Sequence, residues 1–326
     1  MNLKEVQRFH IPCEEWQSPR SLLWDGDDLV DQVGGTRFRL NGTIERRKAC
    51  FGGPFDRAVS SADMRYSAIY QALGTKGLIL RNNEIVREVN RSFYHASTYE
   101  YPIALFYLPD GRPVLAHCPQ EYNKIEIEEI ESGKSLTVRK GDAADFFHSR
   151  LQVSPDGEYL LSAGWVWQPM DHVQLFPLRE IFKTPELLDE WANIETPEEM
   201  CEVNVAAFSG NDTLILIGGD GDVTGNNFLA RYNLKQGKVD MKAALQEPTG
   251  TIMPLGQEYL VGFYKHPKLF EISSGKIIER WPDFDSGTQN SSIIHPAAKL
   301  PPLALDADQK RFAVGDLKGI TVIRLG

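Results

Sequence analysis

Short apolar runs alternate along the whole chain with turns rich in Asp, Asn and Gly. Two turns are nearly identical: residues 108–111 read Leu-Pro-Asp-Gly and residues 154–157 read Ser-Pro-Asp-Gly, with Asp110 and Asp156 46 positions apart. Apolar runs flank both turns, as the paired strands of a β-hairpin require. Weaker versions of this turn occur at residues 25–26, 62–63, 210–212, 255–257 and 306–308. The pattern therefore predicts one strand pair for each of these turns.

A second series of turns alternates with the first. Residues 131–134, 235–238 and 273–276 all end in Gly-Lys, and each lies between a third apolar run and a fourth. Each period of about 45 residues therefore holds about four short strands, which is typical of one blade of a β-propeller.

The repeat predicts an all-β fold: a single domain over residues 1–326 that forms a seven-bladed β-propeller of four-stranded blades. The seventh blade is one strand short, because the chain ends at Gly326 after a third apolar run. We expect an N-terminal strand over residues 5–11 to close the ring, since an open edge would expose unpaired backbone groups. The expected blades are residues 21–50, 56–90, 102–140, 149–200, 203–245, 250–281 and 300–326.

One segment, residues 177–200, departs from the strand pattern. Its apolar positions have helical spacing, with Pro185 suited to the first helical position and Thr184 to the cap before it. We therefore expect a short helical insertion at about residues 184–192 in the fourth blade.

Two stretches carry a family resemblance. Residues 153–178 contain a Ser-Pro-Asp-Gly turn, a strand of small residues, an Asp turn and a strand that ends in an aromatic-polar pair, and residues 312–325 repeat the strand, turn and strand. This order resembles the WD-repeat β-propeller superfamily in a divergent form. No blade carries the Trp-Asp dipeptide or the Gly-His pair of that family. The resemblance implies the fold, and it implies the family's usual role as a protein-interaction platform.

Charge and composition narrow the range of partners and compartments. The chain is 42% hydrophobic, has a formal net charge of −10, and contains no apolar stretch close to the length of a membrane helix. Nucleic acids and anionic membranes would need a basic face, so we expect neither as a partner. Residues 1–20 lack the apolar core of a secretory signal, which favours a cytoplasmic location. We also expect a monomer. The four cysteines lie far apart without a CxxC pair, which indicates inert thiols.

Loop length separates the two faces of the expected propeller. The turns between the first and second strands, and between the third and fourth, are short and repetitive. The second-to-third turns and the connections between blades are long and unrepeated, and function concentrates in such loops on a rigid scaffold. The long segments are residues 50–57, 90–101, 140–150, 165–172, 218–227 and 281–300.

The long loops carry aromatic and acidic residues that would suit a basic protein partner. Such a partner, for example a basic toxin, would make this protein a bacterial immunity or regulatory factor. A solvated acidic surface, and tryptophans packed between blades, are the alternatives. The acidic side chains are those of Asp142, Asp145, Asp171, Asp220, Asp222, Asp283 and Asp285. The predicted partner-binding residues are Tyr94, His95, Asp145, His148, Trp165, Trp167, Asp171 and His295.

An enzyme is the rival hypothesis. His95, His148 and His295 lie in connections that lead into inner strands, so they could converge on a metal at the channel mouth of a hydrolase or lactonase. Histidines that donate hydrogen bonds to loop backbone are the alternative. The chain has no GxSxG or HExxH motif, so we expect no catalytic residue, metal or cofactor. Binding of a small ligand in the channel is a third possibility, for which the sequence gives no specific signal.

Overall fold

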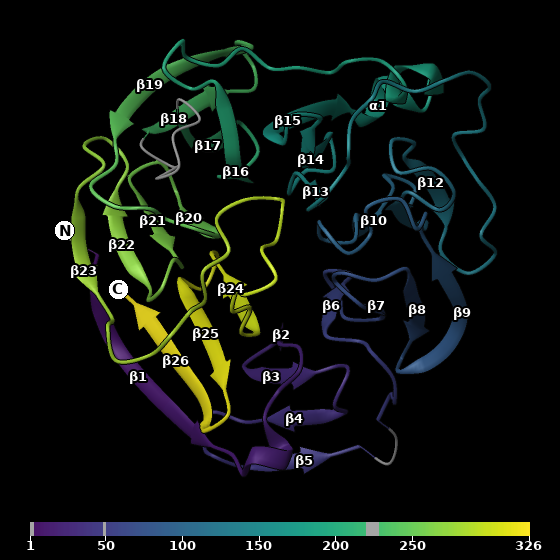
Figure 1. Ribbon diagram of the computed structural model, residues 1–326. Coiled ribbons are helices and arrows are strands. Elements are labelled where there is room, and N and C mark those ends of the chain that lie inside the picture. The colour runs from purple at the N-terminus through teal and green to yellow at the C-terminus, as the bar shows by residue number, and fades with distance from the viewer. Residues whose placement is uncertain (1–2, 48–49, 220–227) are drawn as a thin grey trace.

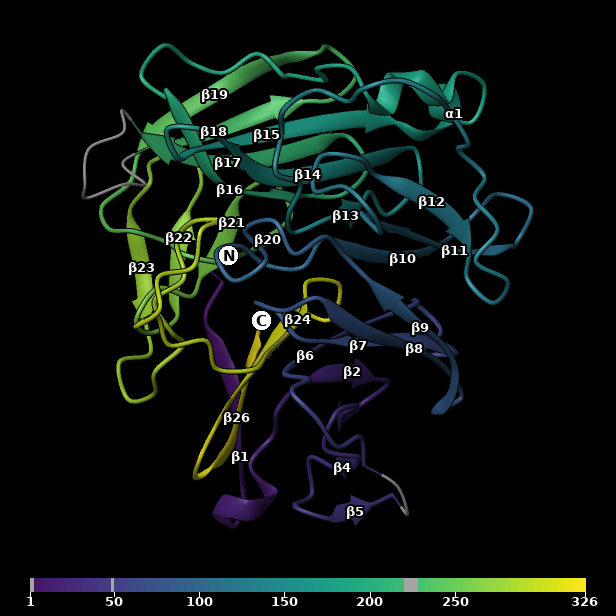
Figure 2. The same ribbon diagram turned by 45° about the vertical axis from the view of Figure 1, so that its right-hand side comes forward.

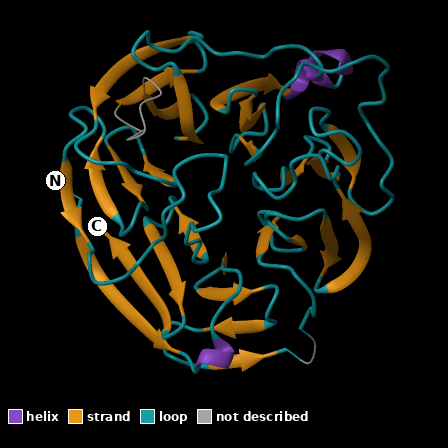
Figure 3. Cartoon of the chain, in the orientation of Figure 1, coloured by secondary structure: helices purple, strands orange, loops and turns teal. Residues whose placement is uncertain are grey.

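The computed structural model describes residues 3–47, 50–219 and 228–326. Within these residues, seven antiparallel sheets stand around a central axis like the blades of a propeller (Figure 1). Strands and loops account for nearly all of the chain, and the few helical turns lie at the periphery (Figure 3). The predicted all-β, seven-bladed fold is confirmed.

The blades follow one another along the chain, and each begins with its innermost strand. Blade 1 contains β2 (Leu23–Asp25), β3 (Asp28–Asp31), β4 (Thr36–Phe38) and β5 (Ile44–Arg46). Blade 2 contains β6 (Arg57–Ser60), β7 (Tyr66–Tyr70), β8 (Lys76–Arg81) and β9 (Glu84–Asn90). Blade 3 contains β10 (Ile103–Tyr107), β11 (Pro113–His117) and β12 (Glu126–Glu129), and blade 4 contains β13 (Gln152–Val153), β14 (Tyr159–Val166) and β15 (Met170–Pro177).

Blades 5 and 6 are four-stranded, and blade 7 takes its fourth strand from the N-terminus. Blade 5 contains β16 (Glu202–Phe208), β17 (Thr213–Gly219), β18 (Phe228–Asn233) and β19 (Lys238–Ala244). Blade 6 contains β20 (Ile252–Leu255), β21 (Tyr259–Gly262), β22 (Lys268–Glu271) and β23 (Ile277–Arg280). Blade 7 contains β24 (Leu303–Asp306), β25 (Arg311–Asp316), β26 (Gly319–Leu325) and β1 (Glu5–Pro12).

The N-terminal strand closes the ring as the sequence predicts. β1 pairs antiparallel with β26 along its length, with Ile11 opposite Ile320 (Figure 2). Ile11 is fully buried, and it packs with Leu22 of blade 1 and Val322 of blade 7. The strand therefore covers the open edge of β26 and contributes to the core between the last blade and the first.

Blades 3 and 4 depart from the expected four strands. In each of them, a single bridge replaces the outer strand: Glu128 with Ser135 in blade 3, and Gln174 with Asn193 in blade 4. In blade 3 the side-chain oxygen of Thr137 accepts a hydrogen bond from the Ile127 amide at 3.0 Å. A side chain thus takes the place of a backbone partner, which ends the ladder after one bridge.

The helical insertion is present but shorter than expected. It consists of α1 (Leu178–Ile181) and a 3₁₀ helix over Pro185–Leu188. Pro185 occupies the first helical position as predicted, whereas the Thr184 side chain makes no capping hydrogen bond. Another 3₁₀ turn (Glu15–Gln17) follows β1. None of the described helices is long and apolar enough to cross a membrane.

The hydrophobic core is divided among the interfaces between neighbouring blades. Alternation along β14 shows why: Leu160 packs against Val114 of blade 3, whereas Leu161 faces the other way toward Leu214 of blade 5. Both faces of a blade are therefore apolar, and each blade is held by its two neighbours.

The repeated turns have the backbone that their glycines predict. Gly111 and Gly157 have φ angles of +82° and +74°, in the left-handed region that glycine adopts without steric cost. In the second turn, the Ser154 hydroxyl donates to the Asp156 carboxylate at 2.6 Å and accepts from the Tyr159 amide at 2.9 Å. These contacts close a tight hairpin that leaves the long loops to the opposite end of the blade.

Candidate functional site

Four of the long loops meet beside the central axis: residues 90–101, 140–150, 165–172 and 281–300. The Ile294 amide, in the connection between blades 6 and 7, donates to the Thr98 carbonyl of the connection between blades 2 and 3 at 2.8 Å. The Ser292 amide donates to the Asp171 carboxylate at the start of β15 at 3.0 Å. The 281–302 connection thus crosses the centre of the ring, where Figure 1 shows it in yellow-green.

A stack of aromatic rings forms where these loops meet. Phe147 lies face to face with Trp165 of β14, with ring centroids 3.9 Å apart and an interplanar angle of 11°. Tyr122 covers the other side of Phe147 at 4.3 Å and 27°. Phe147 and Trp165 are fully buried. The rings come from two loops and from β14, so the stack joins three separate segments of the chain.

Exposed aromatic side chains cover this buried base. Trp167, at the tip of the β14–β15 turn, is 44% exposed and lies 5.5 Å from Phe147 and from Trp165. Tyr94 is 46% exposed and lies 5.0 Å from Tyr122. We call Phe93, Tyr94, His95, Tyr122 and Trp167 the aromatic surface; Phe93 is its most exposed member at 86%.

A buried arginine fixes the loop that carries Tyr94 and His95. The Arg91 guanidinium donates to the carbonyls of Gly74, Ala72, Ala96 and Tyr99. It also lies over the rings of Tyr99 and Tyr101 at 4.7 and 5.0 Å. Burial lowers the pKa of this guanidinium. Arg91, at the start of the loop over residues 90–101, is therefore bonded to residues near its end.

Close backbone approach places Phe147 against β14. The Phe147 amide donates to the Trp165 carbonyl at 2.9 Å, and the Trp165 amide donates to the Phe147 carbonyl at 3.2 Å. Gly164 makes room for this pair, because a Cβ atom there would lie 1.9 Å from the Phe147 carbonyl oxygen. The glycine is thus required for steric reasons, and its φ is not in the left-handed region.

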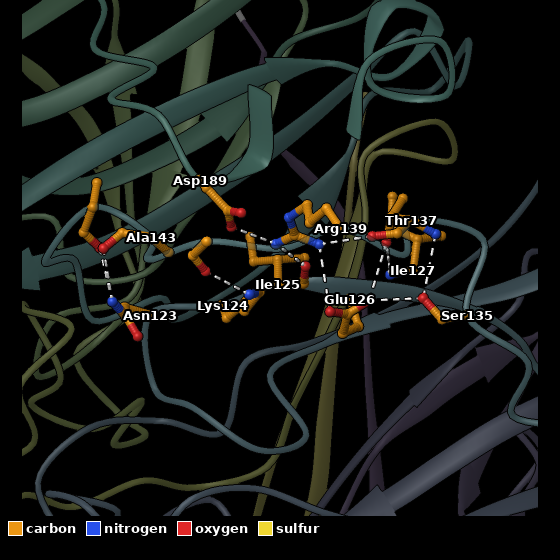
Figure 4. A network of polar contacts seen from close by, with 12 residues as sticks. Asn123, Lys124, Ile125, Glu126, Ile127, Ser135, Thr137, Arg139, Ala143 and Asp189 are labelled. Atoms are coloured by element: carbon orange, nitrogen blue, oxygen red, sulfur yellow. Dashed lines mark hydrogen bonds and ion pairs between the residues drawn. The ribbon is translucent and has the colours of Figure 1, made fainter. Parts of the chain in front are cut away.

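A polar network holds the loop that leads to Phe147 (Figure 4). The buried Arg139 side chain donates to Asp189 at 2.7 Å and to the Ile125 carbonyl at 2.8 Å. Asn123 donates to the carbonyls of Ala143 and Ala144 at 3.1 and 3.2 Å. These bonds connect the loop to blade 3 and to the helical insertion of blade 4, so the aromatic stack rests on a fixed support.

The acidic residues divide into exposed and neutralised groups. Asp145 is exposed and accepts a hydrogen bond from the Tyr122 hydroxyl at 2.7 Å, which together with burial raises the pKa of that tyrosine. Asp142 is also exposed. Asp283 pairs with Arg8, and Asp285 pairs with Lys299 at 3.0 Å. Asp220 and Asp222 lie outside the described residues. Asp145, in the connection between blades 3 and 4, therefore places a carboxylate against the aromatic surface.

Five of the eight predicted binding residues come together: Tyr94, His95, Trp165 and Trp167 belong to the aromatic cluster, and Asp145 contacts it through Tyr122.

The other three lie apart from the exposed cluster. His148 is buried and pairs with the Ser162 hydroxyl at 3.0 Å, and burial lowers its pKa to about 3. Asp171 is buried under Ser292 and Asn204. His295 is exposed, and its ring accepts a hydrogen bond from the Ala297 amide at 3.1 Å. His148 and Asp171 therefore support the fold of the loops and are not at the surface.

The three-histidine metal hypothesis gains no support from this arrangement. His95 contacts aromatic rings, His148 faces the interior of blade 4, and His295 bonds to its own loop. In the described part of the chain, no three His, Cys, Asp or Glu side chains are grouped so that they could hold a metal ion.

Sequence reasoning missed the two rings that connect the cluster, Tyr122 and Phe147. Phe147 lies between Asp145 and His148, whose side chains carry charge or ligand chemistry. A phenylalanine in a long loop carries no such chemical signal. Tyr122 follows the second strand of blade 3, in a loop that was not among the long segments. Large apolar residues in a loop were the available signal, because such residues need a packing partner.

The fold defines the class of the molecule as a seven-bladed β-propeller. No protein-family model matches the chain. No curated protein sequence is significantly similar to it. Among solved structures, the fold is similar to that of a hydrazine synthase chain from Kuenenia stuttgartiensis, with a TM-score of 0.63 and 13% sequence identity over 94% of this chain and 95% of the other. At this identity the likeness supports the fold alone, and propellers carry many unrelated functions.

Proposed function

We propose that this protein is a non-enzymatic interaction module that binds a partner protein through its aromatic surface. The observation that carries the proposal is the exposure of Trp167 and Tyr94 above a buried, stacked base, with the exposed Phe93 next to Tyr94 in the chain. Tryptophan and tyrosine dominate binding energy at protein interfaces, because they offer a large apolar area with few rotatable bonds. Loops that are already fixed lose little entropy on binding.

Charge favours a basic partner. The chain has a net charge of −10, and the exposed Asp145 accepts a hydrogen bond from Tyr122 of the aromatic surface. Asp142 is exposed in the same loop. Complementary charge speeds association and disfavours acidic competitors. In this proposal the protein is a cytoplasmic, divergent WD-repeat-like propeller, and an immunity or regulatory role follows if its partner is a basic toxin or enzyme.

Alanine variants test the proposal. Trp167→Ala and Tyr94→Ala remove exposed rings of the aromatic surface. Trp16→Ala is the matched control, since Trp16 is 64% exposed and lies over the Arg46 guanidinium, away from the four loops. Proteins captured from the native host by the wild type and by Trp16→Ala, but by neither of the other two variants, are the candidate partners.

A titration with the purified partner then decides the matter. We expect Trp167→Ala to weaken binding at least about 10-fold, as loss of an interface hot spot does. The Trp16→Ala control should bind like the wild type. A partner that binds Trp167→Ala and Tyr94→Ala as tightly as the wild type would contradict the proposal.

A further inference from the structure

A cavity of about 360 Å³ lies inside the ring, lined by the inner strands and by the 281–302 connection. Blades 2, 4 and 7 contribute residues from β6, β13 and β24. Leu305, which is 36% exposed, lines one end. The volume lies within the range of small-molecule sites.

Two arginines face this cavity without a carboxylate partner. Arg57 donates to the carbonyls of Asp56 and Leu300 at 2.9 and 3.3 Å. Arg150 donates to the carbonyls of Ala163 and Asn204 at 3.1 and 2.7 Å. None of the ion pairs between described residues includes either guanidinium. A guanidinium has five N–H donors, so donors remain free in both.

Arg150 has a φ of +44°, in the left-handed region. This conformation precedes the inner strand β13, where the side chain enters the cavity lining. Burial lowers the pKa of the guanidinium, while the carboxylates of Asp171 and Glu100 oppose that effect.

Glu100 is the one carboxylate among the lining residues, and it accepts hydrogen bonds from the Tyr70 hydroxyl at 3.3 Å and from Gln289 at 3.4 Å. Lys299 also lines the cavity but pairs with Asp285. The carboxylates of Asp171 and Glu100 both act on Arg150, so they balance its charge in part. What the cavity offers a ligand is therefore the set of free guanidinium N–H donors, which favour an acceptor such as a carboxylate.

We propose that this cavity binds a small organic anion whose carboxylate groups are held by Arg57 and Arg150. The planar guanidinium fork matches a carboxylate in geometry and charge. Tyr101, Ile103 and Phe263 supply an apolar wall for the carbon skeleton of the ligand. The free N–H donors thus select the carboxylate, and the wall selects an organic ligand.

Isothermal titration with succinate, citrate and inorganic phosphate at constant ionic strength tests the proposal. We expect saturable binding of at least one carboxylate, and a loss of at least about 10-fold in affinity in Arg57→Gln. The matched control is Arg39→Gln, which removes an exposed arginine paired with Glu45 outside the cavity and should bind like the wild type. Arg57→Lys should retain part of the affinity, because it keeps the charge but not the fork.

Arg150→Gln is the second variant, and its urea unfolding curve shows whether it folds; the Arg57 variants keep the test valid if it does not. Absence of carboxylate binding, or equal affinity in Arg57→Gln and in the wild type, would overturn the proposal. Binding of phosphate alone would overturn the assignment to a carboxylate. Trp167→Ala should leave anion binding unchanged, so this result stands apart from that of the protein-binding experiment.

Discussion

The close approach of Phe147 to β14 leads to a quantitative prediction for Gly164→Ala. The added Cβ would lie 1.9 Å from the Phe147 carbonyl oxygen and 2.8 Å from the ring of Phe146, and real Cβ contacts essentially never fall below 3.0 Å. The loop must therefore retreat by about 1.1 Å. That shift breaks the two backbone hydrogen bonds between Phe147 and Trp165, each worth about 0.5–1.5 kcal/mol. Overpacking of a filled core adds about 1–3 kcal/mol, so we expect a loss of roughly 2–6 kcal/mol.

Urea unfolding, followed by tryptophan fluorescence, measures this loss. The unfolding midpoint of Gly164→Ala should fall by about 1 M, because the free energy of unfolding decreases linearly with urea. Gly52→Ala is the matched control: no atom lies within 4 Å of its Cβ position, and its backbone is not left-handed, so its midpoint should match that of the wild type. Equal midpoints for Gly164→Ala and Gly52→Ala would refute the steric argument.

Three further expectations concern ring closure, a repeated turn and a buried histidine. Deletion of residues 1–12 removes the strand that covers β26, so thermal unfolding should lose its cooperativity or shift to much lower temperature; an unchanged melting curve would contradict the closure. Gly157→Val should cost about 1–2 kcal/mol from backbone strain alone, because φ is +74° and no atom lies within 4 Å; a wild-type urea midpoint would argue against a left-handed turn. The folded protein binds a proton at His148 only near pH 3, whereas the unfolded chain binds it near pH 6.5, so this histidine contributes stability above pH 6.5 that is lost as the pH falls. Between pH 7 and pH 5, urea unfolding should show a shallower loss of stability in His148→Gln than in the wild type, and equal slopes would contradict this assignment.

The ring of blades was predictable from the sequence because turn chemistry is local. A Pro-Asp-Gly turn requires a left-handed glycine wherever it occurs, and apolar alternation fixes which side chains face each neighbouring blade. The N-terminal strand was predictable for a different reason, since the count of strands left one edge open. The missing outer strands of blades 3 and 4 were not predictable. In blade 3 the ladder ends where the Thr137 side chain bonds to the Ile127 amide, and in blade 4 only Gln174 and Asn193 form a bridge. The alternation of apolar and polar residues does not indicate such individual contacts.

The candidate site was predictable only in its outline. Loop length and aromatic content indicate loops that do meet in the structure, where Tyr94, His95 and Trp167 lie together. Residue chemistry alone could not separate exposed residues from buried ones. His148 and Asp171 looked functional because they are polar and lie in long loops, yet each is buried with a hydrogen-bond partner. Buried polar groups of this kind are satisfied by neighbours that lie far away in sequence.

The buried base and the exposed rings of the aromatic cluster should respond differently to substitution. Phe147 and Trp165 belong to the core, so changes to them alter folding as well as binding. Trp167 and Tyr94 rest on that base with nearly half of their surface open, so their removal costs the fold far less than it costs an interface. Arg91 fixes the loop that carries Tyr94, and Arg139 fixes the loop that leads to Phe147, so both loops are ordered in the free protein. A surface that is ordered in advance spends little of its interaction free energy on ordering, which is what a small patch of aromatic residues needs in order to bind tightly.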